Sequence, residues 1–165
     1  MAFWSTNDVE PSRQFRFKIQ TGDGGEDWWW AKSVTKPSFS VNESEYQLIN
    51  HKFKYPGIVS WGNVTIRIVD PNNRAEYWYY KLRNYGWAAP TADDAALGLS
   101  KEGISESFEY MEIMQLDSNG EPVETWNLNN PKIASVNFGS LDYSSDELVV
   151  LDIEISYDWA NLKEE

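Results

Sequence analysis

The segment Leu148–Trp159 constrains the fold more than any other, because apolar and polar residues alternate along it. Successive side chains of a β-strand point to opposite faces, so this alternation predicts a strand with one buried and one solvated face. The predicted buried set is Val149, Leu151, Ile153, Ile155, Tyr157 and Trp159, and the predicted solvated set is Asp152, Glu154, Ser156 and Asp158. A sheet with one solvated face is typical of antiparallel strands.

Further segments show strand periodicity or lie between turn signals. We predict strands over residues 15–20, 28–34, 64–69, 108–116, 123–128 and 133–138. Residues 39–54 have no clear period and are predicted to be an irregular strand or an extended loop, followed by a turn at Tyr55-Pro56-Gly57. The chain is therefore expected to form a single domain over residues 1–165, mainly β, as an antiparallel β-sandwich or barrel of about seven strands.

One flanking α-helix is predicted over residues 74–85, between a capping segment at 70–73 and a terminating Gly86. One broad face of this helix combines Tyr77, Tyr80, Leu82 and Tyr85, with Trp78 beside it. Residues 88–107 are small, polar and interrupted by Gly and Pro, which predicts a long loop with a short helical turn near 93–97. Long loops in compact domains are commonly functional or mobile.

The charge of the chain is acidic and unevenly distributed. The net charge is −12; residues 1–101 carry 12 Lys+Arg and 11 Asp+Glu, whereas residues 102–165 carry 2 and 15. Such a surface does not favour gripping nucleic acid, since that binding depends on Lys and Arg replacing counterions along the phosphates. The acidic surplus can serve solubility alone.

The chain contains no cysteine, which removes disulfides and thiol chemistry and is compatible with assembly in a reducing cytoplasm. The first residues lack the basic and apolar regions of a signal peptide, and no window reaches the ~20 apolar residues of a membrane span. We expect a protein that is neither exported by a classical signal nor anchored in a membrane.

No catalytic, cofactor or metal site is predicted. The lone His51 has no second histidine, no cysteine and no compact carboxylate cluster to complete a metal site. Nucleophile-elbow and phosphate-binding motifs do not occur in the sequence. A small hydrolase would need two acids in a cleft, and the available pairs, Asp93-Asp94 and Asp152 with Glu154, are more typical of a solvated surface.

Aromatic residues are abundant, with nine Trp and nine Tyr. Trp28, Trp29 and Trp30 are consecutive, so on a strand they point to both faces, and at least one face needs cover from outside the domain's own core. Trp and Tyr favour interfaces because they bury a large area and keep a hydrogen-bonding tip. A carbohydrate-binding β-sandwich, with these tryptophans or Trp61 as a stacking platform, is the alternative that composition does not separate.

The order of elements and several motifs resemble the tail tube protein of contractile-tailed, T-even-type bacteriophages. The resemblance rests on Phe15-Arg16-Phe17-Lys18-Ile19, on Pro37, and on Tyr55-Pro56-Gly57 before Val64-Thr65-Ile66 and the central helix. It is closest where Gly139-Ser140-Leu141-Asp142-Tyr143-Ser144 leads into the last strand, which ends at Tyr157-Asp158-Trp159. The resemblance spans nearly the whole chain, although residues 88–107 have no clear equivalent.

This resemblance implies a virion structural protein and not an enzyme. Copies of the chain would close into hexameric rings, and the rings would stack into the inner tail tube that conducts DNA and the tape measure protein during ejection. The implied partners are further copies, the tail sheath, the tape measure and the baseplate, with DNA passing without specific binding and with no membrane anchor. The protein would lie in the virion tail after assembly in the host cytoplasm. A baseplate-proximal ring, or the inner tube of another contractile injection system, has the same features.

Two sets of residues are assigned to this assembly. Contacts between subunits or rings are expected from Trp28, Trp29, Trp30, Asp93, Asp94 and Leu97. Lumen-facing carboxylates that keep DNA from sticking are expected among Glu109, Glu112, Glu124, Asp152 and Glu154. Alternatively, Asp152 and Glu154 pair across strands with Arg16, Lys18 or Arg67, which would use the same charge within the fold.

Overall fold

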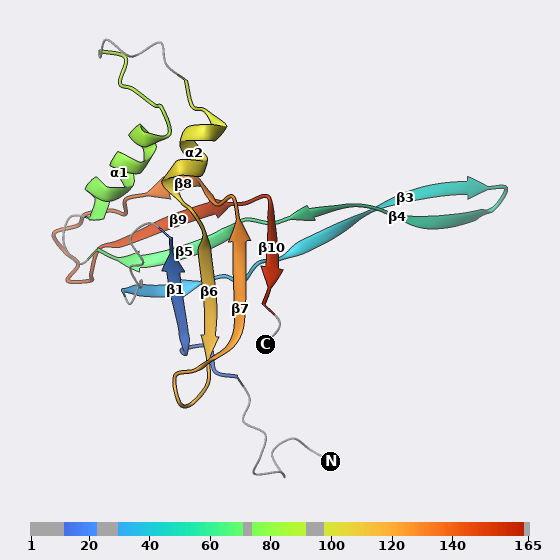
Figure 1. Cartoon of the computed structure of the whole chain (residues 1–165), viewed down its shortest axis with the longest axis horizontal. Coiled ribbons are helices and arrows are strands. Elements are labelled where there is room, and N and C mark those ends of the chain that lie inside the picture. Colours follow the sequence, from blue (N-terminus) through green and yellow to red (C-terminus); the bar gives the residue numbers. More distant parts are fainter. Residues whose placement is uncertain (1–11, 23–29, 71–73, 92–97, 164–165) are drawn as a thin grey trace.

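The computed structural model describes residues 12–22, 30–70, 74–91 and 98–163 (Figure 1). The strands are β1 (Phe17–Thr21), β2 (Ala31–Val34), β3 (Phe39–Leu48), β4 (His51–Trp61), β5 (Val64–Val69), β6 (Met111–Leu116), β7 (Pro122–Asn129), β8 (Lys132–Asn137), β9 (Val150–Ser156) and β10 (Trp159–Leu162). The helices are α1 (Arg74–Asn84) and α2 (Lys101–Ser107). The prediction of a mainly β, antiparallel chain is confirmed, with ten strands in the described residues instead of about seven.

Two four-stranded antiparallel sheets form the body of the molecule. Sheet A has the strand order β1-β6-β7-β10, and sheet B has the order β2-β5-β9-β8. Within the described residues neither sheet closes on itself, so each sheet ends in two strands that are paired along one side only. The architecture is therefore an open sandwich and not a closed barrel.

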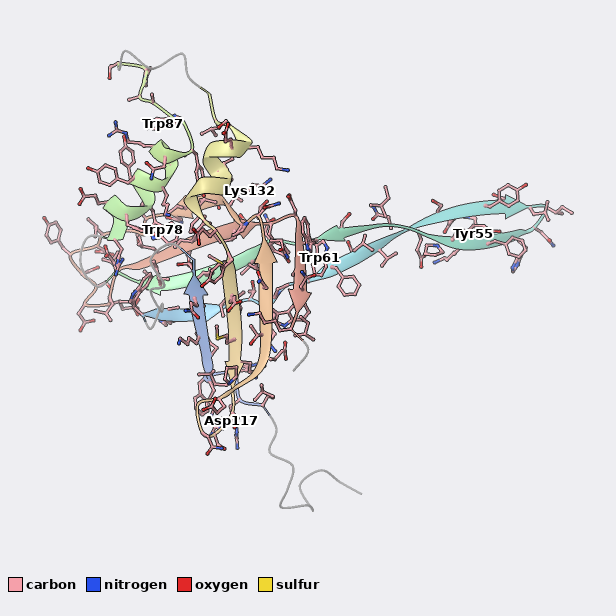
Figure 2. All side chains as sticks on the ribbon, in the orientation of Figure 1. Tyr55, Trp61, Trp78, Trp87, Asp117 and Lys132 are labelled. Atoms are coloured by element: carbon pink, nitrogen blue, oxygen red, sulfur yellow. The ribbon has the colours of Figure 1, made fainter. Side chains whose placement is uncertain are left out.

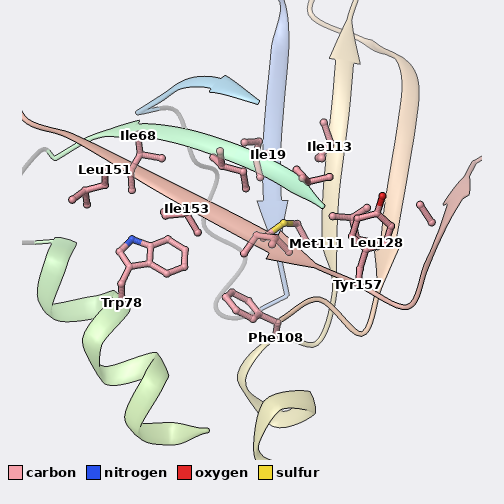
Figure 3. Close-up of a cluster of buried hydrophobic side chains, with 14 of the residues drawn as sticks. Ile19, Ile68, Trp78, Phe108, Met111, Ile113, Leu128, Leu151, Ile153 and Tyr157 are labelled. Atoms are coloured by element: carbon pink, nitrogen blue, oxygen red, sulfur yellow. The ribbon is translucent and has the colours of Figure 1, made fainter. Parts of the chain in front are cut away.

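The core lies between the two sheets (Figure 3). In β5 and β9 every second residue is buried, which is the alternation that the sequence predicted. The most buried side chains include Ile19, Met111 and Leu128 from sheet A, and Ile68, Leu151 and Ile153 from sheet B. Each such side chain stabilises the fold by about 1.5–3 kcal/mol relative to an exposed one.

The C-terminal segment does not form the single strand predicted over Leu148–Trp159. It breaks after β9, and β10 then pairs with β7 in the opposite sheet. The backbone amide of Asp158 donates to the carbonyl of Asn129, at 3.0 Å, where the chain crosses. Tyr157 remains buried, but Trp159 is 46% exposed and lies outside the predicted core face. This crossing ties the two sheets together at one side of the sandwich.

Helix α1 confirms the predicted helix and its end. Gly86 follows it with a φ of +102°, a conformation that glycine adopts without steric cost. Trp78 and Lys81 are the buried residues of α1, and Tyr85, directly after the helix, is buried as well. Tyr80, which was predicted on the same face, is 51% exposed. These buried positions follow the i, i+3, i+7 spacing of one helical stripe.

Helix α2 lies in the segment predicted to be a loop. Ser100 caps it by accepting a hydrogen bond from the amide of Gly103, at 3.1 Å. Phe108 follows the helix and packs on Trp78 of α1, with the ring centroids 6.5 Å apart. The Lys81 ammonium lies 4.7 Å from the centre of the Phe108 ring. Both helices therefore cover one end of the sandwich (Figures 1 and 3).

Strands β3 and β4 form a separate two-stranded hairpin, called the arm, which projects from the body (Figure 1). The predictions of one irregular segment over 39–54 and of a turn at residues 55–57 are wrong. The chain turns at Ile49 and Asn50, where Ile49 has a φ of +56°, and Pro56 and Gly57 lie inside β4.

Truncation of the core at Ile153 tests the packing between the sheets. Ile153→Ala is expected to lower the free energy of unfolding by about 2–5 kcal/mol, because this fully buried side chain leaves a cavity. Urea unfolding of the unassembled subunit measures it. The control Ser33→Ala changes an exposed residue on the outer face of sheet B and should cost under about 1 kcal/mol.

The burial of Tyr85 predicts that the free energy of unfolding falls at alkaline pH. Burial raises the pKa of Tyr85 to about 12, and the hydrogen bond that its hydroxyl accepts from the Ile133 amide opposes this shift. The folded state keeps this hydroxyl neutral, so its contribution to the free energy of unfolding is fully present below pH 10. That contribution declines as the pH rises from 10 to 12. Tyr85→Phe should make the fall in unfolding free energy over this window shallower. The control is Tyr143→Phe, at an exposed site. If the free energy of unfolding falls equally between pH 10 and 12 in both variants, Tyr85 is not the group responsible.

Candidate assembly surfaces

The arm is a pair of strands with no other partner in the described chain. Every residue of β3 is exposed, and in β4 all except Trp61 are exposed. The two strands pair only with each other. An isolated two-stranded hairpin is marginally stable in water, and its edges present unpaired backbone groups to other chains. The arm therefore has the properties of a segment that is covered by another molecule.

The outer half of the arm, called the tip half, has one aromatic and one charged face. Tyr46 lies opposite Phe53 and Leu48 opposite His51, and the His51 and Phe53 rings are 4.7 Å apart. The other face carries two ion pairs, Lys52 with Glu45 at 3.1 Å and Lys54 with Glu43 at 3.0 Å. Each face is thus chemically uniform along the tip half. Tyr55 also lies on this half (Figure 2).

The inner half of the arm, called the base half, joins the body through aromatic contacts. Phe39 lies opposite Trp61, with ring centroids 5.5 Å apart, and Val41 lies opposite Val59. Trp61 lies where the arm meets the body (Figure 2). Its ring is also 6.0 Å from the ring of Tyr157, which lies between β9 and β10. This contact anchors the arm to the edge of the core.

A β-bulge separates the two halves. The register shifts between the pairs Val41–Val59 and Glu43–Pro56, so β4 holds one extra residue. Gly57 lies at this bulge, where an added Cβ would stand 2.8 Å from the carbonyl oxygen of Asn42. The close approach of the two backbones therefore requires glycine.

Most of the predicted subunit contacts fall outside the part of the chain that the structure describes: Trp28, Trp29, Asp93, Asp94 and Leu97. Trp30 is described, and it belongs to the core of its own subunit. The Arg74 guanidinium lies 4.9 Å from the centre of its ring. Trp30 is only 7% exposed, so little of its side chain is available for contact with another subunit.

The five predicted lumen carboxylates do not share one surface. Glu109 is exposed between α2 and β6. Glu112 is nearly buried on β6 and pairs with Lys163. Glu124 pairs with Lys36, 2.9 Å away, and so links sheet A to the segment after β2. Burial acts to raise the pKa of Glu124, but hydrogen bonds from Lys36 and Trp126 outweigh it and lower the pKa.

Asp152 and Glu154 lie together on the outer face of sheet B. The Arg67 Nε donates to Asp152 Oδ1 at 2.7 Å, and this hydrogen bond lowers the pKa of Asp152. Glu154 accepts hydrogen bonds from Asn63 at 2.9 Å and Ser135 at 3.1 Å. Cross-strand pairing with Arg67, the alternative considered for these acids, is therefore present for Asp152.

A band of polar side chains extends from these acids across the outer face of sheet B. Its members are Ser33, Thr65, Arg67, Ser135, Asn137, Asp152 and Glu154. Neighbouring strands bring these residues into register, so the face is hydrophilic from β2 to β8. Sequence periodicity identified the β9 members of this band but gave no sign of which strands lie beside them.

Within the described residues, no three His, Cys, Asp or Glu side chains group closely enough to hold a metal ion. No helix in the described part of the chain is long and apolar enough to cross a membrane. What the geometry offers is surface for assembly: open sheet edges, a projecting arm and a polar face.

Comparisons with known proteins agree with this picture. A family model described as T4-like virus tail tube protein gp19 matches residues 13–161. No curated protein matches the chain in sequence.

Solved structures share the fold at low sequence identity. A chain of the PVC sheath-tube complex in the extended state, from an extracellular contractile injection system, is 21% identical, with 99% of this chain and 98% of that chain covered and a TM-score of 0.70. A chain of the anti-feeding prophage tube-terminating cap is 21% identical, with full coverage of both and a TM-score of 0.70. A type six secretion system protein is 8% identical over 90% of this chain and 82% of its own, with a TM-score of 0.54. The family match spans nearly all the described residues, so the chain is a structural tail tube protein and belongs to the T4-like virus tail tube protein gp19 family.

Proposed function

We propose that copies of this chain close into hexameric rings, and that the rings stack into the inner tube of a contractile tail. The observation that carries this proposal is the open form of sheet B, with unpaired edges at β2 and β8 and a polar outer face between them. Side-by-side copies can pair these edges, which removes the exposed backbone groups and produces a continuous wall. The family membership supports the same arrangement, and the structures that share the fold include a sheath-tube complex and a tube-terminating cap.

The polar band of sheet B would then line the bore. DNA and a tape measure protein are the cargo implied by the family, and a wall for such cargo must offer weak contact. Asp152 and Glu154 are the two predicted lumen acids that lie on this face. Arg67 lies on the same face, and Lys32 lines the same hollow as Arg67 and Asp152, so the wall is hydrophilic and carries charges of both signs. Charges of this kind act over about 8 Å at physiological salt.

The outer surface of the tube would meet the sheath, and its end would meet the baseplate. Structures that share the fold come from a sheath-tube complex and from a baseplate. In this proposal the protein acts as a conduit in the virion tail, without catalysis, after assembly in the host cytoplasm. The carbohydrate-binding alternative is disfavoured, because Trp30 is buried and Trp61 is held between Phe39 and Tyr157.

Self-assembly can be tested on purified protein. We expect negative-stain images at high concentration to show six-fold rings or tubes, because the arm and the sheet edges can pair with other copies. Sedimentation velocity over a concentration series should show monomer giving way to larger species. Monomer at every concentration, together with no polymerisation on a baseplate, would overturn the proposal.

Neutralising the sheet B acids tests which face lines the bore. Tubes of Asp152→Asn/Glu154→Gln should retain more short duplex DNA than wild-type tubes in co-sedimentation, and the excess should shrink as salt is raised. The control Glu109→Gln/Glu121→Gln removes the same charge outside this face. Equal retention by both variants would show that another surface lines the bore. Failure of the first variant to assemble would show that these acids act in subunit contacts instead.

A further inference from the structure

The free edge of β8 presents only some of its backbone groups to a partner. Successive residues of a strand point their N–H and C=O groups to alternate sides, so an edge strand offers about every second residue to a neighbour. The Asp70 amide donates to the carbonyl of Val149, at 3.1 Å, so alternate residues of the following strand β9 bond to β5 and the remainder to β8. By the register of β8 with β9, Ser135 then faces β9, whereas Ile133 and Val136 face away from it.

Tyr85 already occupies one of these outward positions. Its hydroxyl accepts a hydrogen bond from the Ile133 amide, at 3.2 Å, and its side chain is 2% exposed. Because Tyr85 directly follows α1, the end of that helix covers the first part of the β8 edge. A bulge at Ala134 separates Ile133 from Val136, where outward pairing can resume. The part of the edge that a neighbouring strand can use therefore begins at Val136.

The edge of β2 offers a matching set of backbone groups. The Thr35 amide donates to the Thr65 carbonyl, at 3.0 Å, so Thr35 and Ser33 face β5 and Val34 faces away from it. Pro37 has no N–H to donate, which limits how far this edge can extend. Directions alternate across sheet B, so β2 and β8 at its two margins are antiparallel (Figure 1). In a ring of copies related by rotation, β8 of one copy would lie antiparallel to β2 of the next.

One register brings residues of the same kind together across this junction. Val34 and Val136 are partly buried and lie on the core side of sheet B. When they are placed opposite each other, Ser33 lies opposite Asn137 on the polar outer face. Cross-strand apolar pairs and hydrogen-bonding pairs both stabilise a sheet. The core side and the polar side would therefore each continue from one copy into the next.

Slips of two residues keep the faces matched but lose these pairs. A slip toward the start of β8 brings Val34 to Ile133, whose amide is already bonded to Tyr85. A slip the other way sets Lys36 against Val136, although the Lys36 ammonium pairs with a carboxylate of sheet A. The first slip leaves a backbone acceptor without a donor, and the second sets a charged side chain against an apolar one.

We propose that Tyr85 is a stop that sets the register between neighbouring copies in a ring, with Val34 of one copy opposite Val136 of the next and Ser33 opposite Asn137. This inference rests on the proposed function, since ring closure supplies the second copy. The stop acts through the hydrogen bond to the Ile133 amide, which confines the neighbouring β2 to the last part of β8. The short length of β2, four residues, fits this restricted edge.

Phe138 would serve as an apolar anchor in this register. It is 46% exposed and follows Val136 on the core side of the sheet by alternation. A hollow beside the β2 edge is lined by side chains of both sheets, among them Phe17, Val34, Ile113 and Trp126. The proposed register places Phe138 of one copy at this hollow of the next. A large apolar side chain would then leave water for apolar surroundings.

Disulfide cross-linking reads the register directly, because the chain has no cysteine. Ser33 and Asn137 would form a non-hydrogen-bonded pair across the junction, with Cα atoms about 4.5 Å apart, which a disulfide can bridge. We expect assembled Ser33→Cys/Asn137→Cys to give a ladder of covalently linked copies under mild oxidation. Within one copy the two positions are three strand spacings apart, roughly 14 Å, so they cannot link to each other.

Two control pairs report the slipped registers. Ser33→Cys/Ser135→Cys and Thr35→Cys/Asn137→Cys each share one cysteine with the test pair, and their Cα atoms would be about 7–8 Å apart in the proposed register. Both should link at least about tenfold more slowly than the test pair. If wild-type protein forms tubes but either control pair links as fast as the test pair, the register is wrong and the tube function stands. If wild-type protein forms no rings or tubes, the proposed function fails, and this inference fails with it.

Removal of the Tyr85 hydroxyl tests the stop itself. Tyr85→Phe leaves the Ile133 amide without its acceptor, and a neighbouring β2 that slips toward it can supply a carbonyl. In the Ser33→Cys/Ser135→Cys background, Tyr85→Phe should raise the rate of cross-linking by about threefold or more. The control Tyr80→Phe, at an exposed position of α1, should leave that rate unchanged. Equal rates in the two variants would show that Tyr85 is not the stop. Thermal unfolding of the monomers checks that each variant is folded.

Discussion

The structure depends on one constraint, which is that the subunit contains more β-surface than its own fold can cover. Two sheets bury their inner faces against each other, but both stop at unpaired edges, and a third pair of strands leaves the body entirely. Exposed strand edges favour pairing with other chains. In a chain of the tail tube family, copies of the same subunit are the natural source of that cover. In the proposed tube, assembly would complete the fold.

The arrangement of charge follows from the same constraint. Most of the described acids that could have faced a bore are already engaged inside the subunit: Glu124 with Lys36, Glu112 with Lys163 and Asp152 with Arg67. The acidic surplus of the chain is therefore distributed over several surfaces. The outer face of sheet B is a continuous polar wall in the described structure, and it lies between the two open edges of that sheet.

The elements that could be predicted from the sequence are those in which the spacing of apolar and polar residues is regular. Residues 150–156 keep a strict alternation, and Gly86 marks the end of α1, so both elements were predictable. The arm was not, because its apolar residues change face at a bulge, and Pro56-Gly57 has the composition of a turn although it lies inside a strand. The alternation also continues through Tyr157, so sequence alone did not show the crossing to sheet A. Trp30 belongs to the core, and the exposed aromatic surface that needs cover is on the arm instead.

Hydrogen exchange measured by mass spectrometry, on monomer and on assembled protein, tests the central claim most directly. The amides of β3, β4 and the edge strands β2 and β8 should exchange much more slowly after assembly, since these backbone groups and side chains gain cover from other copies. The amides of β9, which are already inside sheet B, should change little. Exchange in the arm and at the sheet edges that is equally fast before and after assembly would contradict the account.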